Sequence, residues 1–177
     1  MANVASRTEG FIHTRLLGPV SCRAYGIGPA AVRLGHVTIV LSDRLAALSV
    51  ATAALLFEDI APKLGHAYPN RPGLPSRRDA RNDLTALVAF NGKQQICDLD
   101  VTPAYSAGDR CGEASVTIGN VRVTVCDRDS AERVAKALAE AYAEAAEAYV
   151  RLRPFEDLRE TRDHRRAVNR ARKAVRV

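Results

Sequence analysis

The sequence predicts an α+β fold built from two internal repeats, each containing strands, a β-hairpin and a helix. Three observations predict this class: a segment that recurs 84 residues later, a glycine turn in each copy, and an apolar helical stretch after each turn. Two such units placed side by side are expected to form one antiparallel sheet with the helices on one face. A basic helix is expected at the C-terminus.

The repeat is visible when residues 31–55 are aligned with residues 115–139. Nine of the 25 aligned positions are identical. They include the turn glycine, Gly35 with Gly119, and the Asp-Arg pair that precedes each helix. Because these matches fall at structurally meaningful points, we interpret them as an internal duplication.

The first repeat covers about residues 11–63. Strand-like segments at 11–15 and 20–25 precede a hairpin that turns at Gly35-His36. Ser42 or Asp43 is expected to cap a helix over 45–57 that ends near Pro62 and Gly65. This helix is apolar nearly all round, which predicts a buried position at the centre of the fold.

The second repeat covers about residues 86–152. Strand-like segments lie on either side of Asn91-Gly92, and Gly119-Asn120 is a two-residue hairpin signal. Folding about this turn places one set of residues on a core face: Ala114, Val116, Ile118, Val121, Val123 and Val125. The other face then carries Ser115, Thr117, Arg122 and Thr124.

The helix of the second repeat is expected to start at a capping box. Asp129 is followed three residues later by Glu132, as such a box requires. An apolar stripe then recurs at spacings of three and four residues: Ala135, Leu138, Tyr142, Ala145, Tyr149 and Leu152. The stripe is expected to pack on the apolar hairpin face.

Residues 64–83 read as a linker between the repeats. Prolines 69, 72 and 75 follow one another at intervals of three, which also suits a polyproline II ligand of an aromatic groove. Residues 1–153 are thus expected to form one globular domain of two repeats. Residues 154–177 are expected to form a basic helical tail.

The net charge of +6 is carried by the last 27 residues, the tail and the three residues before it. Residues 151–177 carry ten basic and four acidic side chains, and residues 1–150 carry sixteen of each. A polyanion attracted by charge is therefore expected to depend on the tail.

The remaining features indicate a cytoplasmic protein without a membrane span or a cofactor. The N-terminus lacks a basic segment followed by an apolar run, and the apolar stretch 45–57 is too short to cross a bilayer. The four cysteines, Cys22, Cys97, Cys111 and Cys126, lack metal-ligand spacing and are expected to be small buried side chains.

No motif of a known reaction is present in the sequence, and we expect no enzymatic activity. Four carboxylates form a weak candidate for a metal or acid–base site: Asp98, Asp100, Asp127 and Asp129. The alternative is that one of the last two caps a helix and that the first two lie on a polar strand face.

The tail contains the one directed charge pattern. Basic side chains recur at helical spacing, and we take them as the candidate nucleic-acid-binding residues: Arg159, Arg162, Arg166, Arg170 and Lys173. Five phosphate contacts predict a log–log salt slope of about −4.5 on duplex DNA. The alternative is a solvated helix whose early acids and late bases complement its dipole, or a helix that contacts an acidic protein.

Two hypotheses for function follow. The first is a non-enzymatic nucleic-acid-associated protein that binds the phosphate backbone with little sequence preference and self-associates through apolar helix faces. The second is a structural or assembly protein, such as a component of a phage or mobile-element particle, whose basic tail docks on a neighbouring subunit.

Overall fold

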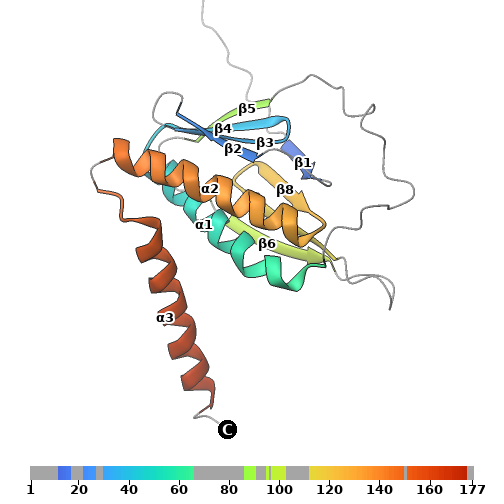
Figure 1. Cartoon of the computed structure of the whole chain (residues 1–177), viewed down its shortest axis with the longest axis vertical. Helices are drawn as coiled ribbons and strands as arrows, with labels where there is room; N and C mark the ends of the chain where they lie inside the picture. The colour runs from blue at the N-terminus through green and yellow to red at the C-terminus, as the bar shows by residue number, and fades with distance from the viewer. Residues whose placement is uncertain are drawn as a thin grey trace, which may run out of the picture.

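The computed structural model shows an α+β protein with two mixed β-sheets and three α-helices (Figure 1). It describes residues 12–16, 22–26, 30–65, 86–90, 95, 97–102, 112–149 and 151–174. Residues 66–83 of the predicted linker over 64–83, which contain its three prolines, and Cys111 lie outside the described residues.

Eight strands form two separate four-stranded sheets. The first sheet has the order β1-β8-β7-β6 and consists of β1 (Ile12–Leu16), β8 (Val121–Val125), β7 (Glu113–Ile118) and β6 (Cys97–Thr102). The second has the order β2-β3-β4-β5 and consists of β2 (Cys22–Tyr25), β3 (Ala31–Leu34), β4 (Val37–Leu41) and β5 (Ala86–Phe90).

The expectation of a single antiparallel sheet was wrong. The first strand of each half pairs in parallel with the last strand of the other half: β1 with β8, and β5 with β4. A hairpin motif predicts only the antiparallel pairing of neighbouring strands. Parallel pairing between strands far apart in the sequence therefore could not be predicted from the local pattern.

The two halves follow the same pairing scheme. In the first, Cys22 pairs with Leu34, and in the second, Cys97 pairs with Ile118. Both hairpins turn at a glycine in the left-handed region, with φ of +61° at Gly35 and +59° at Gly119. Glycine is required there because a side chain disfavours this conformation, which confirms the two predicted turns.

The first two helices begin at equivalent aspartates. Asp43 accepts a hydrogen bond from the Ala46 N–H at the start of α1 (Arg44–Ile60), and Asp127 accepts one from the Ser130 N–H at the start of α2 (Arg128–Ala148). Asp43 was one of the two residues, with Ser42, predicted to cap the first helix. The predicted capping box at Asp129 was wrong, because Asp127 satisfies the free N–H groups of the first turn. The alternative, in which one of Asp127 and Asp129 caps a helix, is confirmed for Asp127.

The core lies between the sheets and the helix pair α1–α2. Each helix packs mainly on the sheet that holds most strands of the other half, α1 on β6 and β7 and α2 on β2 and β3, and the two helices contact each other along their length. All six apolar residues predicted for the hairpin face are buried. Thr124 lies on the predicted polar face but is only 2% exposed, because His13 and Ser115 hydrogen-bond to its hydroxyl.

A short 3-10 helix, η1 (Ala61–Lys63), follows α1. Within the described residues, Arg44–Lys63 is the one helical stretch long and apolar enough to cross a membrane by length and composition alone. More than half of it is buried inside the fold, as in the core helix of a globular protein.

The third helix, α3 (Phe155–Ala174), follows Pro154 and extends away from the body formed by the sheets and the first two helices (Figure 1). Its first residue anchors it. Phe155 is buried, with its ring centroid 6.0 Å from that of Tyr142 on α2. The Tyr142 hydroxyl donates a hydrogen bond to the Arg153 carbonyl at 2.8 Å, which fixes the connection between the helices.

Candidate polyanion-binding groove

Three of the five predicted binding residues contact the acidic end of α1. Arg159 donates two hydrogen bonds to Glu58, at 2.5 and 3.2 Å. Arg162 lies 3.1 Å from an Asp59 oxygen and donates to the Leu55 carbonyl at 3.2 Å. These contacts hold the first half of α3 against α1.

Arg166 makes a further contact of this kind. Its two terminal N–H groups donate hydrogen bonds to the two carboxylate oxygens of Asp59. The hydrogen bond to Glu58 raises the pKa of Arg159, and the hydrogen bond to Asp59 raises the pKa of Arg166. We call Glu58, Asp59, Arg159, Arg162 and Arg166 the anchor cluster. Its arginines are partly neutralised by the chain itself.

The other two predicted residues lie farther along α3. Arg170 is exposed and makes no ion pair with the described residues. Lys173 lies within the helix, and its side chain is outside the described part. The predicted stripe is thus divided in two. Arg159, Arg162 and Arg166 lie in the anchored half of α3, and Arg170 and Lys173 lie in what we call its projecting half.

A groove of about 630 Å³ runs between α1 and α3, and we call it the basic groove. Six arginines line it: Arg44, Arg151, Arg153, Arg162, Arg165 and Arg166. Asp59 is the one acidic residue among the described residues that line it. Its floor is apolar and includes Leu48, Leu55, Leu56, Leu152 and Leu158.

Four of the six arginines have free guanidinium groups. Arg44, Arg151, Arg153 and Arg165 are exposed, and within the described residues their side chains form no ion pair or hydrogen bond. They come from the start of α1, the α2–α3 connection and the middle of α3. Segments far apart in the sequence therefore present uncompensated positive charge to one groove.

Sequence reasoning missed these four residues because they do not share one helical stripe. One signal was available for Arg44. In the aligned repeat, Arg128 pairs with Glu132 one turn later at 2.6 Å, whereas the residue one turn after Arg44 is Leu48. An arginine without an acidic neighbour at that spacing is a candidate for an external anion.

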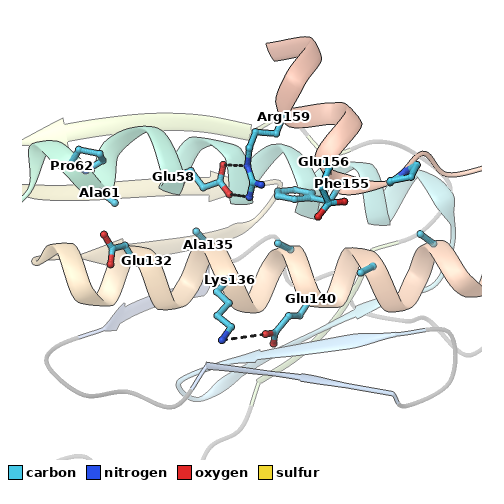
Figure 2. A pocket seen from close by; sticks show the side chains of 14 residues that line it. Glu58, Ala61, Pro62, Glu132, Ala135, Lys136, Glu140, Phe155, Glu156 and Arg159 are labelled. Carbon is cyan, nitrogen blue, oxygen red and sulfur yellow. Dashed lines mark hydrogen bonds and ion pairs between the residues drawn. The ribbon is translucent and has the colours of Figure 1, made fainter. Parts of the chain in front are cut away.

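A second groove, of about 710 Å³, lies along α2 beside the start of α3, and we call it the acidic groove. Figure 2 shows the side chains that line it. Its charged residues are Glu58, Glu132, Lys136, Glu140, Glu156 and Arg159, and its floor includes Ala135, Ala139 and Ala143. Acidic groups outnumber basic ones, and Lys136 lies 3.8 Å from Glu140. This groove does not suit a polyanion.

The four carboxylates considered for a metal or acid–base site are separated. Asp127 is the cap of α2, and Asp100 on β6 accepts a hydrogen bond from Arg122 at 2.5 Å. Among the described residues, no group of three or more possible ligands is arranged to hold a metal ion. The structure gives no support to a site built from these four residues.

The described cysteines are buried or half-buried. Burial raises the pKa of the Cys22 and Cys97 thiols to about 11, so both are protonated near neutral pH. Cys126 is buried. A protonated thiol is a poor nucleophile, which fits the packing role expected for these residues.

Comparisons of the chain with protein-family models, curated proteins and solved structures gave no match. The arrangement of side chains is therefore the basis for assigning a function.

Proposed function

We propose that this chain is a non-enzymatic protein that binds the phosphate backbone of nucleic acid in the basic groove and along the projecting half of α3. One observation carries the proposal: four exposed arginines that have no ionic partner within the described residues converge on a groove whose described lining holds one carboxylate. Guanidinium groups donate paired hydrogen bonds to phosphate oxygens, and their positive charge persists at any physiological pH.

Binding of this kind is expected to tolerate sequence. Phosphate contacts position a protein on nucleic acid without reading the bases, and no element of the described structure is placed as a base reader. Arg170 extends the basic surface beyond the groove. Together with the four groove arginines it gives about five phosphate contacts and a log–log salt slope of about −4.5 on duplex DNA.

The experiment is fluorescence anisotropy of labelled duplex DNA, single-stranded DNA and RNA with the full chain across a salt series. The test variant is R44Q/R151Q/R165Q. The control is R23Q/R33Q/K63Q, which removes the same charge from exposed positions outside the groove. A test variant that binds as well as the control would overturn the proposal.

We expect the test variant to bind about 100-fold more weakly at low salt, because each lost hydrogen bond at an exposed site costs about 1 kcal/mol and the variant loses three of them. The log–log salt slope of the test variant is expected to be shallower by about 2.7, because three phosphate contacts contribute about 0.9 each. The control is expected to change affinity by less than about threefold, since long-range attraction is screened at moderate salt. The nucleic acid bound most tightly identifies the class of partner.

A second candidate is an assembly protein whose α3 docks on a neighbouring subunit, such as a component of a phage or mobile-element particle. The acidic groove favours it, because its excess of glutamates complements the basic end of α3. Concentration-dependent assembly in light scattering, lost in E132Q/E140Q, would support it. A monomer at all concentrations would exclude it.

We also propose that the chain arose by internal duplication and acts in the cytoplasm. The shared pairing scheme, with Gly35 and Asp43 equivalent to Gly119 and Asp127, supports an origin by internal duplication. A cytoplasmic location suits a protein that meets nucleic acid without a membrane partner.

A further inference from the structure

The outward face of the sheet β1-β8-β7-β6 carries two rows of polar side chains. Strand register places Arg15, Thr124, Ser115 and Asp100 in one row across the four strands. The adjacent row, two residues away, contains His13, Arg122, Thr117 and Asp98. A hollow of about 470 Å³ lies over these rows.

Hydroxyl groups at the centre of the hollow form a connected chain. The Thr124 hydroxyl lies 2.7 Å from the Ser115 hydroxyl and 2.8 Å from Nε2 of His13. Thr124 is only 2% exposed, whereas His13 is exposed at the strand edge. These two hydrogen bonds therefore fix the imidazole ring and the Ser115 hydroxyl on the sheet surface while leaving both accessible to a ligand.

Two arginines are held over this chain by carboxylates on other strands. Arg15 reaches across β8 to Glu113, and Arg122 reaches across β7 to Asp100 at 2.5 Å. Each ion pair uses the Nη2 atom. Within the described residues, Nε and Nη1 of both guanidinium groups have no hydrogen-bond acceptor, so oriented donors remain for a ligand.

The fold itself does not demand this polar face. On the other sheet, the row that corresponds to Arg15, Thr124, Ser115 and Asp100 is largely apolar and consists of Ala89, Val40, Ala31 and Tyr25. The row that corresponds to His13, Arg122, Thr117 and Asp98 is mixed and consists of Leu87, Thr38, Arg33 and Arg23. The polar row around Thr124 and Ser115 is thus specific to the first sheet, and polar groups that the fold does not require there indicate a ligand.

We propose that this hollow binds the phosphate group of a small phosphorylated ligand. Two guanidinium groups, each already paired with one carboxylate, an imidazole and the hydroxyls of Ser115 and Thr117 are donors that a tetrahedral oxyanion accepts from. Asp100 lines the hollow at the β6 edge, and Asp98 lies two residues away on the same face of that strand. These carboxylates are acceptors for a hydroxyl or amino group on the rest of the ligand. The site goes beyond the proposed function, because α1 packs on the opposite face of this sheet and the basic groove lies past α1.

The test is a titration of the full chain with inorganic phosphate and with ribose 5-phosphate at constant ionic strength. Nitrogen-resolved NMR of the His13 imidazole and calorimetry are the readouts. We expect phosphate to shift the His13 signals, and ribose 5-phosphate to bind about tenfold more tightly because it also reaches the aspartates. Equal affinity of the two probes would identify a site for free phosphate.

Three variants separate this site from the basic groove. R15Q/R122Q is expected to weaken phosphate binding at least about tenfold, and S115A about threefold. R23Q/R33Q, on the other sheet, and R44Q/R151Q/R165Q, in the basic groove, are expected to leave it unchanged. If R15Q/R122Q fails to fold, S115A remains as a test, since it removes only one outward hydroxyl.

Unshifted His13 signals, or unchanged affinity in both R15Q/R122Q and S115A, would overturn this proposal without touching the proposed function. Loss of phosphate binding in R44Q/R151Q/R165Q alone would assign the phosphate to the basic groove. Loss of nucleic-acid binding in that variant, with the His13 shifts intact, would support both sites independently.

Discussion

The outward faces of α1 and α2 occupy equivalent places in the two halves, yet they carry opposite chemistry. Under the 84-residue shift, Leu48 corresponds to Glu132, Leu55 to Ala139 and Leu56 to Glu140. The α1 face lines the basic groove and the α2 face lines the acidic groove. The same helix frame is therefore used for two different surfaces.

This difference shows where function resides in the molecule. The positions shared by the halves are those that the fold needs: the turn glycines, the capping aspartates and the buried apolar faces. The positions that differ are half-buried or exposed and line the grooves. We expect a partner to be recognised by this second set, since a fold by itself does not specify a partner.

Reversing the charge of the basic groove is expected to weaken binding most. R44E/R151E/R165E replaces three attractive contacts with repulsion, so we expect nucleic-acid affinity to fall at least about 1,000-fold at low salt. Anisotropy measures the loss, and circular dichroism checks that the fold is kept. Residual affinity within tenfold of the parent chain would show that binding occurs elsewhere.

The converse change makes the α2 face resemble the α1 face in charge. E132K/E140K is expected to raise affinity about tenfold at low salt, because the acidic groove then attracts phosphate. E147K/E160K adds the same charge outside both grooves and is expected to raise affinity about threefold at most. Equal gains in the two variants would mean that net charge, rather than groove position, determines binding.

The anchor cluster determines whether α3 stays beside α1. In E58Q/D59N the arginines lose their charged partners, and we expect tryptic cleavage after Arg159, Arg162 and Arg166 to become several-fold faster. These ion pairs are half-buried, with the Asp59 side chain 14% exposed, and each is expected to contribute on the order of 1 kcal/mol, so the melting temperature is expected to fall by only a few degrees. Cleavage at the parent rate would show that Phe155 alone holds the helix.

The two halves are expected to show the same thiol reactivity. Cys22 and Cys97 lie at equivalent positions, and burial raises the pKa of both thiols to about 11. Alkylation by iodoacetamide is therefore expected to be slow at pH 8 for both and to rise about tenfold per pH unit toward 11, because only the thiolate reacts.

Mass spectrometry of each cysteine peptide measures these rates, and urea-unfolded protein is the control, in which thiols titrate near their ordinary pKa of about 8.5. Reaction of either residue at the unfolded rate would contradict its burial.

The parts of the fold that depend on local periodicity were predictable from the sequence. Alternation identified the buried residues of β7 and β8, and the Gly35 and Gly119 turns were placed correctly. The exchange of β1 and β5 between the halves was not predictable, because nothing in a five-residue strand specifies a distant parallel partner. Asp127 was one of two aspartates considered as the cap of the second helix, and alignment with Asp43 would have selected it.

The candidate site was predictable only in part. The spacing of arginines in α3 was visible, but their contacts with Glu58 and Asp59 join residues about a hundred positions apart. The groove arginines Arg44, Arg151 and Arg153 became candidates once the fold brought α1 and the α2–α3 connection together. Charge convergence is a tertiary property, so composition could indicate the tail but not the groove.

The most direct test of the central claim is arginine footprinting with phenylglyoxal, with and without saturating nucleic acid, followed by mass spectrometry of the full chain. We predict protection of Arg44, Arg151, Arg153 and Arg165, and none of Arg23 and Arg33 on the second sheet. Unchanged modification of all four groove arginines in the complex would contradict the account.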